Sequence, residues 1–174
     1  RKLAETLGRK LVNFYRRHAK KDWLWFENCL TYSNAILPYS LLEPNDRTLN
    51  DRALNSLQFL NRVSRINGVP APIGNKGWYC KGKKRAIYDQ QCVDSADMVL
   101  ANLAAFELTH DHRYRKEAEG WFGWFYGNNV KKTVMVTEDG GCFDGINEDR
   151  INTNQGAESV LAYLLAYLAL ARLR

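Results

Sequence analysis

The sequence predicts an all-α fold built from three αα-hairpins. Six segments show helical periodicity, and they alternate between amphipathic helices and helices that are apolar on nearly every side. A helix that is apolar all round must be covered on all sides, so we expect three inner helices surrounded by three outer ones. The starts of the three apolar segments resemble one another at offsets of 63 and 64 residues, which is typical of a repeat architecture.

The amphipathic segments carry an apolar face opposite a polar one. We expect these outer helices at about 2–18, 46–66 and 111–126. In the first of them, Leu3 and Leu7 recur at helical spacing opposite a row of lysines and arginines. Asn45 or Asp46 is placed to cap the start of the second helix, and Gly68 follows its end.

The apolar segments contain few charged residues. We expect these inner helices at about 29–42, 91–108 and 155–172. Pro38 should kink or limit the first of them. Only residues 133–137 have the composition of a β-strand. The longest apolar run, residues 160–171, has 12 residues, which is too few to cross a bilayer.

The charge of the chain is unevenly distributed. The 174 residues have a formal net charge of +6. Residues 1–21 hold eight bases and one acid, a net of +7, whereas the other 153 residues hold 17 bases and 18 acids, a net of −1. Nucleic-acid binding by the basic segment is disfavoured, because it contains no known motif and a charged outer helix is usually a solvated face.

The length corresponds to one domain. We divide it into hairpins at about 1–44, 45–109 and 110–174, and the start at an arginine indicates a piece of a longer protein. Cys29, Cys80, Cys92 and Cys142 are too few for a disulfide scaffold and wrongly spaced for a zinc site. We therefore expect four free thiols, a cytoplasmic location and no metal or other cofactor.

Polar and aromatic residues gather at the starts of the inner helices. Because the hairpins repeat in phase, these starts should lie at one rim of the assembly. Amides and carboxylates bond sugar hydroxyls, and aromatic rings cover the apolar face of a pyranose. A pair of carboxylates can also hydrolyse a glycosidic bond. The candidate catalytic acids are Glu27, Asp89, Asp144 and Glu158, and the candidate substrate-binding residues are Trp25, Asn28, Tyr32, Asn34, Asn75, Trp78, Tyr79, Gln90, Gln91, Asn154 and Gln155.

Each of these residues also has a simpler interpretation. Asn, Asp and Gln at helix starts often cap orphan backbone N–H groups. Glu158 lies one turn inside an apolar helix, where an unpaired acid is costly, so we expect it to be functional or networked. Trp121 and Trp124 are expected to be core residues rather than ligand platforms.

The motifs that carry a family resemblance are Trp25-Phe26-Glu27-Asn28, Pro72-Ile73-Gly74-Asn75, Gly77-Trp78-Tyr79, Asp89-Gln90-Gln91, Gly140-Gly141-Cys142-Phe143-Asp144-Gly145 and Asn154-Gln155-Gly156-Ala157-Glu158-Ser159. They resemble the bacterial (α/α)6-toroid domain of the six-hairpin glycosidase superfamily, which is associated with glycosyltransferases and mannoside-processing enzymes. The resemblance implies half of a toroid, with the missing half supplied by further chain or by a second copy. Cys92 stands where the family has a proline.

The resemblance and the site residues together imply a carbohydrate-active protein. The first hypothesis is a glycoside hydrolase-like enzyme that acts on a mannose-type or related oligosaccharide. The alternative is a non-catalytic carbohydrate-binding accessory domain of a glycosyltransferase. The resemblance also raises a sugar epimerase, since such enzymes of this toroid class use histidines of the inner wall as acid and base. That function is disfavoured, because His18, His110 and His112 all fall at the ends of expected outer helices. Metal binding by His110-x-His112 is also disfavoured, because no third ligand is placed nearby, and a solvated turn is the preferred interpretation.

Overall fold

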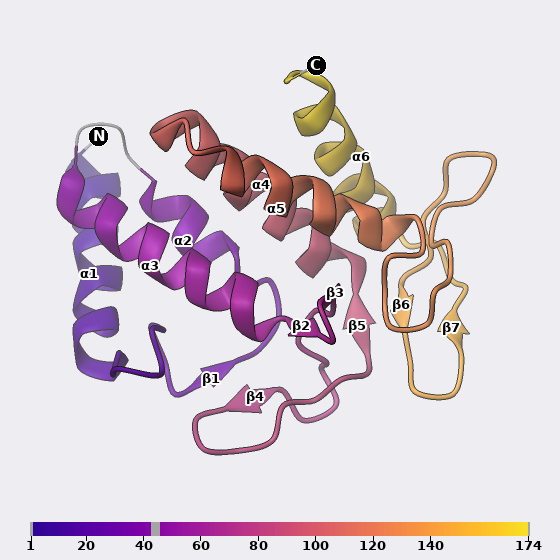
Figure 1. Ribbon diagram of the computed structural model, residues 1–174, viewed down its shortest axis with the longest axis horizontal. Helices are drawn as coiled ribbons and strands as arrows, with labels where there is room; N and C mark the ends of the chain where they lie inside the picture. Colours follow the sequence, from indigo (N-terminus) through magenta and orange to yellow (C-terminus); the bar gives the residue numbers. More distant parts are fainter. Residues whose placement is uncertain (1, 43–45, 174) are drawn as a thin grey trace.

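The fold is mixed, with six α-helices and three small antiparallel sheets in the residues that the structure describes (Figure 1). A computed structural model describes residues 2–42 and 46–173. The helices are α1 (Lys2–His18), α2 (Ile36–Leu41), α3 (Arg47–Val63), α4 (Cys92–Thr109), α5 (His112–Phe122) and α6 (Ala157–Ala171), and a short 3-10 helix η1 (Gly123–Phe125) follows α5.

The strands lie in the segments that connect the helices. They are β1 (Cys29–Leu30), β2 (Arg65–Ile66), β3 (Val69–Pro70), β4 (Tyr79–Cys80), β5 (Gln90–Gln91), β6 (Gly145–Ile146) and β7 (Ile151–Asn152). β1 pairs with β4, β2 pairs with β3, and the third sheet has the order β5-β6-β7. In that third sheet Gln91 lies opposite Gly145, and Gly145 lies opposite Asn152.

The prediction of an all-α fold, and with it half of an (α/α)6 toroid, is wrong. About 51% of the chain is helical and 12% is extended. Each strand has only two residues, which is too short for the alternation of a strand to be visible in a sequence. Within the expected strand 133–137, Val134 and Val136 make isolated bridges only. The expected hairpin boundary at 44 and 45 lies outside the described residues.

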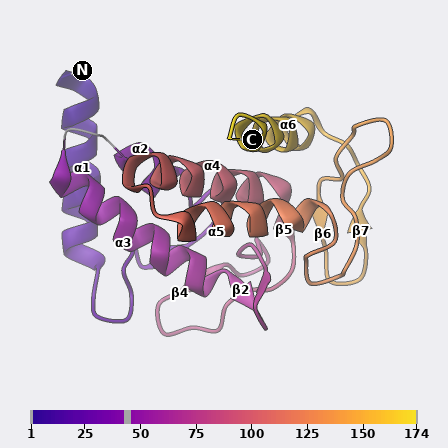
Figure 2. The same ribbon diagram turned by 45° about the horizontal axis from the view of Figure 1, so that its top comes forward.

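α4 lies at the centre of the helical part. It packs against α5 and α6, and α2 covers it on the side away from α6 (Figures 1 and 2). The core between the helices and sheets holds large aromatic side chains that are fully buried, among them Trp25, Phe26 and Phe125. Trp121 and Trp124 are both 0% exposed, so the prediction that they are core residues is confirmed.

The start of α3 agrees with the sequence-based prediction, whereas its end does not. The carboxylate of Asp46 accepts a hydrogen bond from the backbone N–H of Leu49 at 3.1 Å, as expected for an N-cap. The helix ends at Val63 rather than near residue 66. Asn67 and Gly68, with φ of 50° and 80°, form the two-residue turn between β2 and β3 instead of a helix cap.

α2 is much shorter than the predicted helix 29–42. The proline ring of Pro38 would clash with the carbonyl four residues earlier, so Pro38 is tolerated only in the first turn of a helix. The preceding turn is closed by Asn34, whose side chain accepts from the N–H of Thr31 at 2.9 Å and donates to its carbonyl at 3.0 Å. Ser33, at a φ of 50°, also departs from helical geometry.

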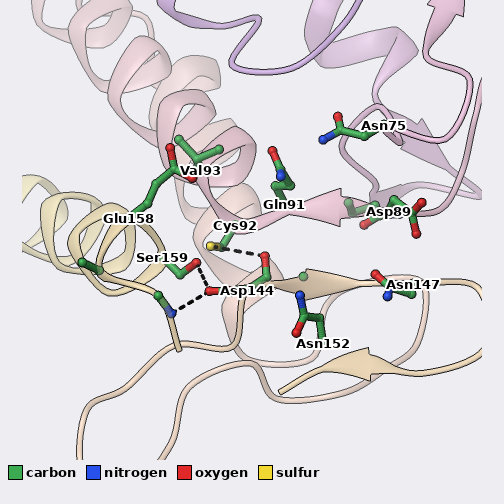
Figure 3. Close-up of a pocket in the computed structure, with 14 residues that line it drawn as sticks. Asn75, Asp89, Gln91, Cys92, Val93, Asp144, Asn147, Asn152, Glu158 and Ser159 are labelled. Carbon is green, nitrogen blue, oxygen red and sulfur yellow. Dashed lines mark hydrogen bonds between the residues drawn. The ribbon is translucent and has the colours of Figure 1, made fainter. Parts of the chain in front are cut away.

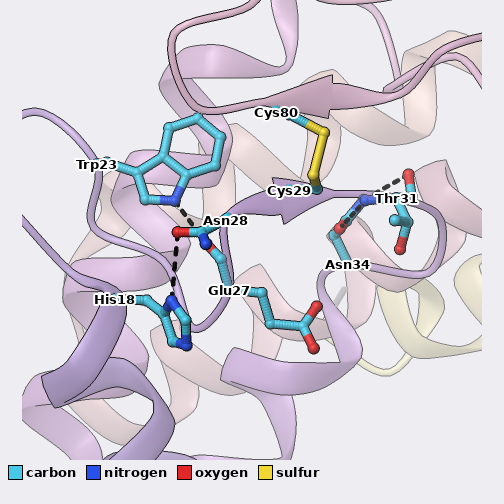
Figure 4. Close-up of a disulfide and its surroundings, with 8 residues drawn as sticks. All are labelled: His18, Trp23, Glu27, Asn28, Cys29, Thr31, Asn34 and Cys80. Atoms are coloured by element: carbon cyan, nitrogen blue, oxygen red, sulfur yellow. Dashed lines mark hydrogen bonds between the residues drawn. A yellow bond between two sulfur atoms is a disulfide. The ribbon is translucent and has the colours of Figure 1, made fainter.

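Cys29 and Cys80 form a disulfide, so the prediction of four free thiols is wrong (Figure 4). The two cysteines face each other across β1 and β4. The N–H of Lys81 donates to the carbonyl of Asn28 at 2.8 Å, which makes the cysteines a non-hydrogen-bonded pair, whose Cα atoms approach most closely. The spacing of 51 residues gave no hint of this pairing. Cys92 and Cys142 are free and buried.

α6 differs from the expected inner helix. Its sequence is apolar on nearly every side, which predicted complete burial. In the structure Leu161, Leu164, Leu165 and Leu168 are 44–54% exposed. No helix in the described part of the chain is long and apolar enough to cross a membrane.

Removing the disulfide should destabilise the fold. Replacing both Cys29 and Cys80 by serine is expected to lower the free energy of unfolding by about 2–4 kcal/mol, because the unfolded chain regains the freedom of a loop 51 residues long. Chemical denaturation measures this change. A reductant should destabilise the wild type by a similar amount and leave the double variant unchanged; a wild type insensitive to reductant would contradict the prediction.

Candidate functional site

A cleft of about 320 Å³ lies where the β5-β6-β7 sheet meets the starts of α4 and α6 (Figure 3). Figure 3 shows Glu158 beside Val93 on one side of the cleft and Asp89 and Asn75 on the other. Its lining residues are Asn75, Asp89, Gln90, Gln91, Cys92, Val93, Asp144, Gly145, Asn147, Asn152, Gly156, Ala157, Glu158 and Ser159.

The segment before β5 supplies Asn75 and Asp89 because it folds back on itself. The N–H of Asn75 donates to the carbonyl of Asp89 at 3.1 Å, and the N–H of Gly74 donates to the carbonyl of Ala86 at 3.3 Å. A Cβ atom at Gly74 would lie 1.9 Å from the carbonyl oxygen of Tyr88. Only glycine therefore allows the two ends of this segment to come together.

The sheet supplies the floor of the cleft. β5 runs directly into α4, and β6 lies beside it through the pairing of Gln91 with Gly145. A Cβ atom at Gly145 would lie 2.3 Å from the carbonyl oxygen of Gln90, so this close pairing also requires glycine. The side chain of Gln90 accepts from the indole N–H of Trp124 at 3.1 Å and donates to the carbonyl of Ile87 at 2.7 Å. These bonds anchor β5 to the core.

Asp144 holds the start of α6 against the sheet. Its carboxylate accepts hydrogen bonds from the N–H of Gly156 at 2.8 Å, the hydroxyl of Ser159 at 2.5 Å and the amide of Asn154 at 2.5 Å. Burial raises the pKa of Asp144, but the donors outweigh this and hold that pKa below its ordinary value. The group therefore stays ionised, which suits a cap and makes it a poor proton donor.

Asp89 and Glu158 are the two acids of the cleft whose carboxylates remain uncommitted. Neither carboxylate makes a hydrogen bond or an ion pair with any residue that the structure describes. Glu158 is exposed in the first turn of α6, and Asp89 is half-buried with a φ of 60°. These two side chains are thus available to a ligand.

The amides of the cleft offer further donors and acceptors. The side-chain oxygen of Asn75 is buried and has no hydrogen-bond partner in the described residues. A buried amide oxygen without a partner costs free energy, which this position bears although the residue lines the cleft. Gln91, Asn147 and Asn152 add further amide groups to the same cleft.

Six of the fifteen predicted site residues line the cleft. They are Asn75, Asp89, Gln90, Gln91, Asp144 and Glu158. Asn154 supports the cleft through its bond to Asp144, and Gln155 is exposed beside the hydroxyl of Thr137 at 3.5 Å.

The residues predicted from the first repeat lie elsewhere. Figure 4 shows Glu27 and Asn28 near the disulfide, where the side-chain oxygen of Asn28 lies 3.3 Å from Nδ1 of His18. Asn34 is buried and closes the turn with Thr31. Tyr32 is 56% exposed outside the cleft lining.

The predicted aromatic platform does not form at the cleft. Trp25 is 1% exposed and packs edge-on against Phe26. Tyr79 packs against Trp23, and Trp78 is 43% exposed at a position outside the cleft lining. Burial of large rings in the core therefore outweighs their use as ligand platforms here.

The sequence-based prediction missed two acids of α4, Asp94, which is buried, and Asp97, which is half-buried. The N–H of Ser33 donates to Asp94 at 2.7 Å, and the hydroxyl of Ser33 donates to Asp97 at 2.5 Å. Burial raises the pKa of Asp94 well above its ordinary value. Burial also raises the pKa of Asp97, and the negative charge of Glu158 raises it further. The repeat contained the signal, because Asp94 and Glu158 occupy equivalent positions after their helix starts.

Cys92 and Cys142 form a buried thiol pair under the cleft. The hydrogen bond with Cys142 lowers the pKa of Cys92, although burial opposes the shift. The thiol of Cys92 also lies 3.8 Å from the carbonyl oxygen of Asp144. Within the described ranges, no group of three or more His, Cys, Asp or Glu side chains is arranged to hold a metal ion. The three histidines lie outside the cleft lining.

Comparisons with known proteins leave the family resemblance as a prediction. No protein-family model matches the chain, and a search of curated proteins gives no significant match.

The buried carboxyl of Asp94 should make stability depend on pH. A folded-state pKa above the unfolded one means that its contribution to stability is complete below the unfolded pKa of about 4 and is lost as the pH rises through the folded pKa. Asp94→Asn should therefore gain stability relative to the wild type as the pH rises above about 4. Urea denaturation at a series of pH values measures the difference.

The control for this experiment is Asp51→Asn, at an exposed position of α3. Its stability difference from the wild type should vary less with pH. Some pH dependence should persist in Asp94→Asn, because Asp97 keeps its own raised pKa. A stability difference between Asp94→Asn and the wild type that stays constant across the series would contradict the assignment.

Proposed function

We propose that the cleft binds a saccharide, with an uncharged sugar ring held by amides and carboxylates. The uncommitted carboxylates of Asp89 and Glu158 carry this proposal, because they line a cleft that also holds several amides and can accept hydrogen bonds from ligand hydroxyls. A volume of about 320 Å³ is at the lower end of small-molecule sites and suits one end of an oligosaccharide.

The charge of the cleft supports a ligand without phosphate or carboxylate groups. Asp89, Asp144 and Glu158 line it, and its lining contains no lysine, arginine or histidine. An anionic ligand would face repulsion from these carboxylates without a compensating base. Sugar hydroxyls can donate to the same carboxylates and accept from the neighbouring amides.

Direct binding tests the ligand class. Mannose-type oligosaccharides titrated into the protein should give saturable binding by calorimetry or NMR. Asn75→Ala and Gln91→Ala should each weaken binding by roughly 3- to 10-fold, the effect of losing one hydrogen bond. Asn55→Ala, at an exposed position of α3, is the matched control and should bind like the wild type. If the Asn75 and Asn55 variants bind equally well, the ligand does not occupy this cleft.

The uncommitted carboxylates of Asp89 and Glu158 favour hydrolysis over binding alone. One would act as the acid, and the other as base or nucleophile, at a glycosidic bond held between them. Asp144 is excluded from the acid role by its three hydrogen-bond donors. The alternative remains a non-catalytic carbohydrate-binding domain that serves an attached glycosyltransferase.

Turnover distinguishes these two functions. With a glycoside that the wild type hydrolyses, Glu158→Gln and Asp89→Asn should each lower kcat by at least about 100-fold. Glu107→Gln, near the opposite end of α4, should retain full activity. Binding without hydrolysis in the wild type would instead identify an accessory domain.

The disulfide also changes the expected location of the protein. The cytoplasmic expectation depended on four free thiols, and the Cys29–Cys80 disulfide removes that support. Disulfides persist mainly in oxidising compartments, so this bond favours such a compartment over the cytoplasm.

A further inference from the structure

α6 exposes a continuous row of leucines. Leu161, Leu164, Leu165 and Leu168, which we call the α6 patch, are spaced so that they share one side of the helix. Each is 44–54% exposed. Figure 2 shows α6 at the edge of the helical part, with α4 and α5 on one side of it only. Exposed apolar rows of this kind mark interaction surfaces.

The charges at the two ends of the α6 patch have opposite signs. Glu158 precedes Leu161 by three residues, and Arg172 follows Leu168 by four, so both lie on the same side of the helix as the leucines. Both are exposed. No charged residue lies between them in the sequence. The patch therefore runs from an acid through four leucines to a base.

We propose that the α6 patch binds the same patch of a second copy of the chain, with the two α6 helices antiparallel about a two-fold axis. In this arrangement leucines face leucines, and Glu158 of each copy lies near the partner's Arg172. A parallel arrangement would instead bring like charges together at both ends. The charge pattern of α6 is thus complementary to itself only when one helix is reversed.

The size of the surface indicates a weak dimer. A standard interface covers roughly 800 Å² on each partner, and a single pair of helices covers less. The apolar row drives the association, because burying the leucines removes their exposed surface from water. We therefore expect a dimer that dissociates on dilution through the micromolar range.

This proposal does not depend on the proposed function. Glu158 borders the cleft as well as the α6 patch, but the dimer requires no saccharide. Self-association and saccharide binding are measured separately, so either proposal can fail while the other stands.

The mass of the unliganded protein across a dilution series tests the proposal. By light scattering or sedimentation, the average mass should rise from that of one chain toward that of two. Leu164→Gln combined with Leu165→Gln should keep the protein at the mass of one chain. Leu7→Gln, which alters a leucine of α1 that is 50% exposed, is the matched control and should dimerise like the wild type. Circular dichroism checks that all variants keep their helices.

A charge exchange tests the orientation of the helices. Glu158→Arg and Arg172→Glu should each weaken dimerisation by roughly 2- to 10-fold, because each creates like-charged contacts at both ends of the pair. The double exchange should restore dimerisation. A protein that stays at the mass of one chain at every concentration would overturn the proposal, as would dimerisation of the double leucine variant. Single charge variants without effect, or a double exchange that fails to rescue, would overturn the antiparallel arrangement.

Discussion

The carboxylate of Asp144 joins the β5-β6-β7 sheet to the first turn of α6, and the cleft exists only where these two elements meet. Three donors from the start of α6 converge on this one group. The carboxylate is only partly buried, and the cost of removing its charge from water is offset because every bond is charge-assisted. Structural and chemical roles are thereby divided among the acids: Asp144 builds the cleft, whereas Asp89 and Glu158 stay free to meet a ligand.

The positions of the helices could be predicted because helical periodicity extends over many residues. α1, α4 and α6 lie within two residues of their expected bounds, and Asp46 caps α3 as the sequence indicated. The sheets could not be predicted, because each strand has two residues and pairs with a partner chosen by tertiary structure. The disulfide depends on the pairing of β1 with β4, so it could not be predicted from the sequence either.

The repeat correctly predicted that residues at the starts of α4 and α6 lie close together. The starts of α4 and α6 lie side by side, which brings Asp89, Gln91 and Glu158 to one cleft. The first repeat does not join them, because its residues pair as β1 with β4 and the chain turns sharply before a shortened α2. Aromatic residues were misplaced because a sequence does not distinguish a ring that stacks on a ligand from one that fills the core.

The Cys29–Cys80 bond encloses α2 and α3 in a covalent ring of the chain. A protease that cuts one peptide bond inside this ring produces two fragments that stay linked through sulfur. The nicked molecule would migrate as an intact chain until it is reduced, and α2 and α3 would remain in place against α4. The ring therefore protects α2, α3 and the segment that supplies Asn75 to the cleft against the loss of a cleaved piece.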